Sequence, residues 1–351
     1  MNLKILSAML LMASACSAGA PDASVNAAPE EKAATQLHYK DISIKRLDPR
    51  LDAIIAEDAK AEIIAEGLQW SEGPVWIGDD QSGYLLFSDV PGNRMHKWSR
   101  NEGASVFLEP SGAAHDATGF REPGSNGLIR DAQDGAILVA NHGLRSIARL
   151  DLTSKSYELV ASAFNGEPFN SPNDLALAND GAIFFTDPPY GLEGINASPM
   201  KRQPANGVYR RDASGDITLL IDDLTFPNGI GLSPDEQTLY VAVSDPQSPV
   251  ILTYDLTADD LMASKTVLHD GGADVAAGKP GLPDGLAIDA TGNLFATAPG
   301  GVHIFSPAGD LIGIIDTGVA NANCTIGEGG ETLFIAANTQ ILRIPLASAH
   351  D

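Results

Sequence analysis

From residue 61 onward, the chain alternates short apolar runs with clusters of Gly, Asp, Asn and Pro. The apolar runs are rich in Val, Ile, Leu, Phe and Tyr, which is typical of β-strands separated by turns. The clearest strands are predicted at residues 84–89, 136–141, 182–187, 238–244, 293–298 and 332–337, and second strands at 146–152, 207–211, 250–256 and 301–306. One helix is predicted, at residues 48–58, with Asp48 as its N-cap and Pro49 at its first position.

A short phrase containing one polar residue recurs just before or within the first strand of each unit. In its clearest form it reads Pro283-Asp284-Gly285, and its other polar residues are Glu72, Asn126, Asn173, Asn228 and Asn323. The intervals are roughly 40 to 55 residues, a period that fits the four-stranded blade of a β-propeller. The sequence therefore predicts an all-β, six-bladed β-propeller whose innermost strands begin at these phrases.

The last unit, residues 324–346, holds only three clear strands before the chain ends. The apolar segment 61–66 can supply the missing strand, so that N-terminal and C-terminal strands close the last blade. Such pairing leaves no exposed sheet edge where the ring closes.

Four of the recurring polar residues carry oxygen donors suited to a hard divalent cation: Glu72, Asn173, Asn228 and Asp284. Because the phrases around these four residues contain neither His nor Cys, a dedicated zinc or copper site is disfavoured. Asn-Gly and Asp-Gly are also the strongest hairpin-turn dipeptides, so ordinary turns are the alternative interpretation. The constant position of these residues before the same strand favours the cation site.

Further residues are candidates for the rim of the same pocket. Asn126, His142 and Asn173 are predicted to bind substrate, whereas Asp187, Tyr190 and His115 are weaker candidates, with Asp187 interpreted as structural. Ser71 and Ser171 have no neighbouring His and Asp pattern that would indicate a serine nucleophile.

Several ordered motifs together resemble the gluconolactonase and senescence-marker-protein (regucalcin) family. They are Ser71-Glu72-Gly73-Pro74-Val75-Trp76, Phe87-Ser88-Asp89, Asn170-Ser171-Pro172-Asn173-Asp174, Thr186-Asp187-Pro188-Pro189-Tyr190-Gly191-Leu192, Pro227-Asn228-Gly229 and Pro283-Asp284-Gly285. The resemblance covers roughly residues 60–346 and is greatest to the bacterial gluconolactonase branch.

This resemblance implies a six-bladed propeller with a central divalent ion, most simply Ca²⁺, with Zn²⁺, Mg²⁺ or Mn²⁺ as alternatives. It implies Glu72, Asn228 and Asp284 as metal ligands and Asn173 as a metal or substrate ligand. Animal members have an arginine where this chain has Ser171, so their sugar contacts do not carry over.

The implied activity is metal-dependent hydrolysis of a sugar lactone. The ion would polarise the lactone carbonyl, and Asp284 would either assist water attack as a catalytic base or act only as a ligand. A phosphotriester hydrolase using the same site, or a non-enzymatic ligand-binding propeller lipoprotein, are the alternatives.

The N-terminus predicts export. Residues 1–16 combine Lys4, an apolar run and small residues before Cys16, which is typical of a bacterial lipoprotein signal with Cys16 as the lipidated residue; cleavage near Ala18 or Ala20 is the alternative. Residues 17–40 are predicted as a flexible tether and 41–350 as a single catalytic propeller domain, held in the periplasm. Any membrane contact would be through the lipid anchor. Cys324 would then have no disulfide partner.

The composition agrees with a folded domain, because 44% of residues are hydrophobic and 19% are charged. The net charge of −24 argues against nucleic-acid binding, which needs clustered Lys and Arg. The partner implied by the resemblance is a small-molecule lactone.

Overall fold

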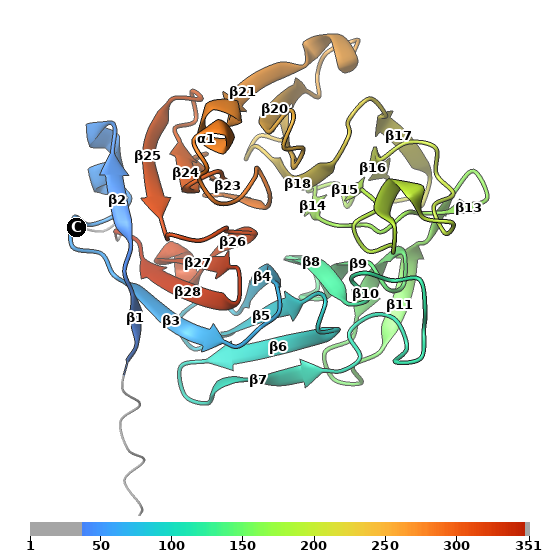
Figure 1. Ribbon diagram of the computed structural model, residues 1–351, viewed down its shortest axis with the longest axis horizontal. Coiled ribbons are helices and arrows are strands. Elements are labelled where there is room, and N and C mark those ends of the chain that lie inside the picture. Colours follow the sequence, from blue (N-terminus) through green and yellow to red (C-terminus); the bar gives the residue numbers. More distant parts are fainter. Residues whose placement is uncertain (1–36, 348–351) are drawn as a thin grey trace, which may run out of the picture. The chain divides into compact units, whose positions relative to one another are not determined.

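The computed structural model describes residues 37–347, which form six antiparallel sheets arranged as a six-bladed β-propeller (Figure 1). The first three blades are β4 (Ser71–Ile77), β5 (Tyr84–Asp89), β6 (Arg94–Ser99) and β7 (Gly103–Leu108); β8 (Ser125–Arg130), β9 (Ile137–Asn141), β10 (Ser146–Leu150) and β11 (Tyr157–Ala161); and β14 (Leu175–Leu177), β15 (Ile183–Asp187), β16 (Gly207–Arg211) and β17 (Ile217–Ile221). A small hairpin, β12 (Ala163–Phe164) and β13 (Glu167–Pro168), lies between the second and third blades in sequence.

The remaining blades follow the same plan, each beginning with its innermost strand. They are β18 (Pro227–Leu232), β19 (Thr238–Val243), β20 (Val250–Asp255) and β21 (Thr266–Asp270); β22 (Leu286–Ile288), β23 (Leu294–Ala298), β24 (Gly301–Phe305) and β25 (Leu311–Asp316); and β26 (Asn323–Gly327), β27 (Thr332–Ala337), β28 (Gln340–Pro345) and β3 (Ala61–Glu66). The predicted fold class is confirmed.

The sixth blade is built from both ends of the domain, as the sequence predicts. Its outer strand β3 pairs antiparallel with β28, with Ile63 opposite Leu342 and Ala65 opposite Ile341. Two short strands were not predicted: β1 (Tyr39–Lys40) extends this blade and β2 (Ser43–Arg46) extends the fifth. The tether predicted to reach residue 40 therefore ends earlier, because β1 is hydrogen-bonded to β3. The rest of the tether, the export signal and Cys16 lie outside the described residues and stay predictions.

The predicted helix at residues 48–58 is shorter than expected. It is a 3-10 helix, η1 (Pro49–Ala53), and Asp48 caps it by accepting a hydrogen bond from the Arg50 backbone N–H at 2.9 Å. A short helix that was not predicted, α1 (Gly272–Ala276), follows β21; three further 3-10 turns are η2 (Ile195–Ala197), η3 (Met262–Ser264) and η4 (Glu328–Gly330). Within residues 37–347, no helix has the length and apolar character needed to cross a membrane.

The six innermost strands contact one another in a ring around the channel, in the order β4, β8, β14, β18, β22, β26 and back to β4. In β4, β8 and β18 a register shift of the bulge type lies where the recurring polar residue occurs. Bulges re-aim side chains and are frequent beside functional sites. The recurring polar residues therefore turn out of the regular pleat at one end of the channel.

The glycine that follows the polar residue permits close packing of neighbouring inner strands. A Cβ on Gly73 would overlap the carbonyl of Asn126, and a Cβ on Gly229 would overlap the carbonyl of Asp284. The Asn228-Gly229 pair is therefore not a hairpin turn, because Gly229 lies inside β18 and has no positive φ. Glycine is needed where another backbone approaches closely.

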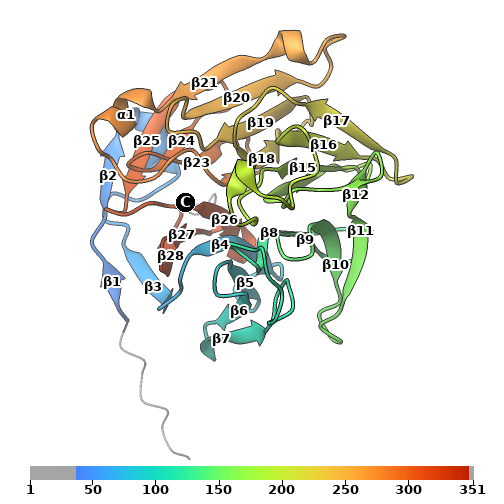
Figure 2. The ribbon, with the colours of Figure 1, turned by 45° about the vertical axis from the view of Figure 1, so that its right-hand side comes forward.

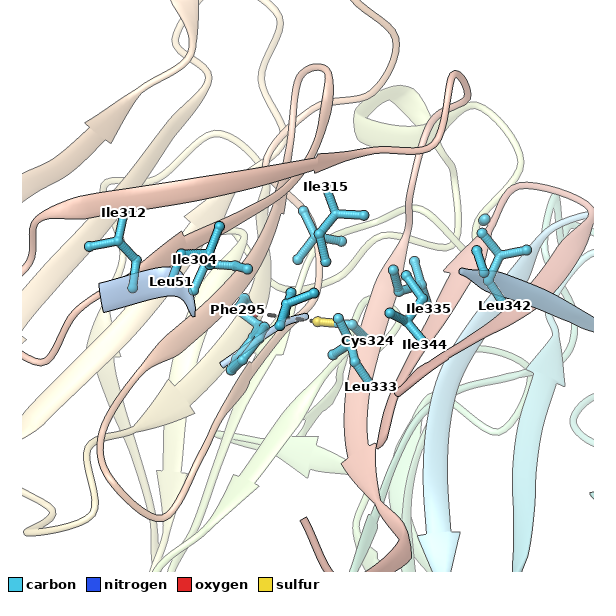
Figure 3. Close-up of a cluster of buried hydrophobic side chains, with 14 residues drawn as sticks. Leu51, Phe295, Ile304, Ile312, Ile315, Cys324, Leu333, Ile335, Leu342 and Ile344 are labelled. Carbon is cyan, nitrogen blue, oxygen red and sulfur yellow. Dashed lines mark hydrogen bonds between the residues drawn. The ribbon is translucent and has the colours of Figure 1, made fainter. Parts of the chain in front are cut away.

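Apolar side chains fill the space between adjacent blades, which buries both faces of each sheet. Figure 3 shows this packing between the fifth and sixth blades, where the labelled side chains include Leu51 of η1, Phe295 of β23 and Leu333 of β27. Cys324 is buried and free in this cluster, and its thiol donates to the Phe295 carbonyl at 3.4 Å. The core is therefore continuous between the fifth blade and the sixth, which is the blade that both ends of the domain build.

Leu333→Ala tests the importance of this junction. Leu333 is fully buried, so its truncation is expected to lower the free energy of unfolding by about 2 to 5 kcal/mol, measured by urea denaturation. Leu159→Ala is the matched control, because Leu159 lies on outer strand β11 with 54% of its surface exposed; its effect should stay within about 0.5 kcal/mol. Equal losses in the two variants would contradict this account.

Candidate functional site

A cavity of about 380 Å³ lies where the six inner strands begin. This volume is in the range of small-molecule sites. Every blade contributes a residue from the start of its inner strand or from the segment just before it. The lining residues are Trp70, Glu72, Arg121, Glu122, Asn126, Asn173, Tyr190, Asn228, Ser244, Gly281, Leu282, Asp284, Ala320 and Asn321. All four predicted metal ligands are therefore brought to one cavity.

Glu72 is nearly fully buried at the start of β4. Its Oε2 accepts hydrogen bonds from the Gly73 backbone N–H at 3.1 Å and from Asn323 Nδ2 at 3.2 Å. Burial raises the pKa of Glu72 to about 8, and the nearby Asp174 and Glu122 carboxyl groups add to that rise. The recurring residue of the sixth blade, Asn323, therefore holds the Glu72 carboxyl group in place.

Asp284 lies just before β22 on the opposite side of the ring from the second blade. Its Oδ1 is buried without a hydrogen-bonding partner among the described residues. Burial raises the pKa of Asp284 well above its ordinary value, and the charges of Glu72, Asp174 and Glu122 act in the same direction, whereas the Asn228 amide opposes them. Asn228 Nδ2 donates to Ser244 Oγ at 2.9 Å.

The buried His142 contacts the side-chain amides of two cavity residues, Asn126 and Asn173. Its Nε2 lies 3.1 Å from Asn126 Nδ2 and 3.5 Å from Asn173 Nδ2, and its Nδ1 lies 3.5 Å from Glu122 Oε2. Burial, with the charge of Arg121 adding, lowers the pKa of His142 to about 3, so the ring is neutral and Nε2 can accept from both amides. The Nδ2 atoms of both amides are thus turned toward His142, and Asn126 Oδ1 is buried without a partner among the described residues.

The structure corrects the prediction that His142 lines the pocket rim. The imidazole is fully buried and is absent from the cavity lining. The reason is the turn at Gly191, where an added Cβ would overlap both the His142 ring and the Ser171 side chain. Because this turn comes from the following blade, its cover over His142 has no local sequence signal.

The three weaker candidates, Asp187, Tyr190 and His115, lie in different environments. Asp187 is fully buried and accepts hydrogen bonds from the backbone N–H groups of Asn170 and Ser171, both at 2.8 Å, so it supports the segment that carries Asn173. Tyr190 lines the cavity and its ring stacks on Phe226 with centroids 5.5 Å apart. His115 does not line the cavity and is exposed.

Sequence reasoning missed two charged residues of the cavity, Arg121 and Glu122. They form an ion pair at 2.7 Å in the segment between β7 and β8. Burial raises the pKa of Glu122 to about 7 although Arg121 acts against that rise. An adjacent Arg-Glu pair in a loop is a weak signal, because such pairs are usually solvated surface charges.

The residues present fit a hard divalent cation. Two carboxyl groups and two carboxamides, from four different blades, face one cavity, and oxygen donors of this kind are the ligands that Ca²⁺ takes. Burial and neighbouring carboxyl groups raise the pKa of both Glu72 and Asp284, and neither forms an ion pair among the described residues; Asp284 Oδ1 is a buried acceptor without a hydrogen-bonding partner in that part of the chain. A bound cation would supply a positive charge and would give Asp284 Oδ1 a partner.

Comparison with known proteins agrees with the fold and the motifs. Residues 70–339 match the family model described as SMP-30/Gluconolactonase/LRE-like region. A gluconolactonase of Zymomonas mobilis is 45% identical over 306 residues, which are 86% of this chain and 85% of that protein.

Solved structures give the same result. The gluconolactonase XC5397 of Xanthomonas campestris superposes with a TM-score of 0.75 at 30% identity, covering 88% of this chain and 97% of that one. A calcium-binding regucalcin of Agrobacterium tumefaciens shares the fold, with a TM-score of 0.59 at 19% identity over 82% of this chain and 94% of that one. On these matches, the chain belongs to the SMP-30/gluconolactonase/LRE-like family, as its motifs predict.

Proposed function

We propose that this protein hydrolyses a sugar lactone in the cavity at the start of the inner strands, with a divalent cation held by Glu72, Asn173, Asn228 and Asp284. The observation that carries the proposal is the convergence of these two carboxyl groups and two carboxamides on a cavity of about 380 Å³. The enzyme class is confirmed at its coarse level, because the Zymomonas relative and the Xanthomonas structure are both gluconolactonases. Lactone hydrolysis is thus the activity for which both relatives are named, and the cation and mechanism are the proposal.

The oxygen-only donor set favours Ca²⁺ as the resident ion. A bound cation would supply Lewis-acid polarisation of the lactone carbonyl. This chain's contribution is to hold the donors rigidly. Asn323 and the Gly73 backbone fix Glu72, while Ser244 fixes Asn228.

Asp284 is the group we propose to assist water attack. Asp284 lines the cavity, and its buried Oδ1 has no hydrogen-bonding partner among the described residues, so it is free to accept a proton from water. The neighbouring carboxyl groups raise its pKa and so strengthen it as a base, whereas a cation beside it would lower that pKa again. The balance between these two effects decides how far Asp284 acts as a base rather than as a ligand.

Substrate orientation is assigned to the remaining cavity residues. Asn126, with its unpaired Oδ1, and Asn173 are proposed to accept hydrogen bonds from sugar hydroxyl groups, and His142 keeps their oxygens turned toward the cavity. Trp70 and Tyr190 give the cavity an apolar wall, and Arg121 supplies the one cationic side chain among its lining residues.

Asp284→Asn tests the proposed base and ligand. The change keeps the side-chain shape but removes the charge, so hydrolysis of gluconolactone is expected to fall by about 10²-fold or more, the range of general acid–base contributions. The measurement is pH-stat titration with the calcium-loaded protein, the chelator-treated protein and the variant, over several aldonolactones and one phosphotriester.

Asp116→Asn is the matched control, because Asp116 is exposed and lies outside the cavity. It should hydrolyse gluconolactone at the wild-type rate. Full activity after chelation would contradict the cation, background rates in every sample would contradict lactone hydrolysis, and turnover of the phosphotriester alone would favour the alternative function.

Glu122→Gln tests the carboxylate cluster through the pH dependence of stability. Because the folded-state pKa of Glu122 is raised to about 7 from 4.5, its contribution to stability is present below pH 4.5 and is lost as the pH rises to about 7. The chelator-treated wild type should therefore lose stability over this interval in urea denaturation, and the variant should lose less. Glu102→Gln, at an exposed position, is the control, and an unchanged slope in Glu122→Gln would refute the assignment.

A further inference from the structure

A second group of metal-binding side chains lies away from the cavity, where the fourth and fifth blades meet. It consists of His269 on β21, Asp274 on α1 and His303 on β24. One ligand atom from each of the three lies within 4.8 Å of the other two. Figures 1 and 2 both draw α1 beside β24 and the end of β21, so three separate elements bring these side chains together.

Three of the four imidazole nitrogens in this group are buried without partners among the described residues. His303 is fully buried, and its Nδ1 and Nε2, like His269 Nε2, have no hydrogen-bonding partner among the described residues. The two rings meet edge to face with centroids 4.7 Å apart. Buried polar nitrogens that are left unpaired cost free energy, and such exceptions call for an explanation.

We propose that His269, Asp274 and His303 bind a transition-metal ion of the zinc type, with solvent completing the coordination. Two imidazoles and one carboxylate are a common three-residue ligand set for Zn²⁺. Ligand atoms in a tetrahedral zinc site lie roughly 3.4 Å apart, given bonds of about 2.1 Å, so binding requires side-chain shifts of about 1 Å. The nitrogen donors distinguish this site from the oxygen-lined cavity, which suits Ca²⁺.

Lys279 is the competitor for this site. Its Nζ pairs with Asp274 Oδ1 at 2.6 Å, so metal binding must displace the ammonium group or use the other carboxylate oxygen. The segment after α1 continues into the cavity wall at Gly281 and Leu282, and Pro280 accepts a hydrogen bond from the Gly300 backbone N–H at 2.8 Å. A metal at this position would therefore tie two blades together at the base of that segment.

Zinc titration of the untagged protein tests the proposal. The protein is stripped with chelator and saturated with Ca²⁺ to fill the cavity, and Zn²⁺ is then added in competition with a chromophoric chelator. We expect one zinc equivalent per chain. His269→Asn should weaken it by at least about 100-fold, since changes to outer-shell partners alone cost roughly 10- to 100-fold.

Four further variants separate this site from its alternatives. His303→Asn removes the buried ligand, and Lys279→Gln, which frees Asp274 without disturbing the core, should tighten zinc binding. His96→Asn is the matched control, because His96 also has an unpaired Nε2 but lies outside the group. Asp284→Asn alters the cavity alone, so its zinc binding should equal that of the wild type.

Cobalt substitution gives a readout that is independent of affinity and of lactone hydrolysis. Co²⁺ in a four-coordinate nitrogen and oxygen site gives intense visible d–d bands, which should vanish in His269→Asn and persist in His96→Asn. The proposal is overturned if the wild type binds no zinc after calcium saturation, if His269→Asn and Lys279→Gln bind zinc as the wild type does, or if Asp284→Asn is the variant that loses it. None of these results depends on whether the cavity hydrolyses lactones.

Discussion

The close contact between neighbouring inner strands is the constraint on which the site depends. At Gly73 the backbone of Asn126, and at Gly229 the backbone of Asp284, lies in the space that a Cβ would occupy. Bulges interrupt three of the inner strands at their recurring polar residues. Side chains from distant parts of the sequence can then face one cavity of small-molecule size.

This geometry has an electrostatic cost. Glu72 and Asp284 are brought together with Asp174 and Glu122, and each carboxyl group disfavours ionisation of its neighbours. Arg121 is the one cationic side chain in the cavity lining, and Glu122 already pairs with it. The cluster is therefore better suited to a bound divalent cation than to an empty pocket, and folding energy from the apolar blade junctions must hold it together in the cation's absence.

Much of the fold could be predicted because local patterns report it. Apolar runs bounded by Gly, Asp and Asn gave the positions of the principal strands, and the period of the recurring phrase gave the number of blades. The strand and helix predictions failed in segments where the hydrophobic pattern is weak. Strands β1 and β2 are short edge strands, and each forms by pairing with a neighbour, β3 or β25. The helix η1 ends at Ala53, so residues 54–58 of the predicted helix are not helical.

The site could be predicted only in part, for a related reason. Glu72, Asn173, Asn228 and Asp284 share a position within each unit, so one repeated pattern identified all four. The role of His142 depends on contacts with Asn126 and Asn173 from two blades and on cover from the turn at Gly191, none of which leaves a local signal. These contacts could not be predicted because the residues lie far apart in the sequence, not because their chemistry is unusual.

The division between strands and loops also bears on substrate choice. The four proposed cation ligands come from the inner strands or the residues just before them, which the ring of strand contacts holds fixed. Arg121 and Glu122, by contrast, come from the long segment between β7 and β8, and Tyr190 from the segment between β15 and β16. Loops tolerate change while a rigid scaffold positions the chemistry. Under the proposed function, the cation ligands and the base therefore belong to the ring, whereas the loops that carry Arg121, Glu122 and Tyr190 would govern the choice among lactones.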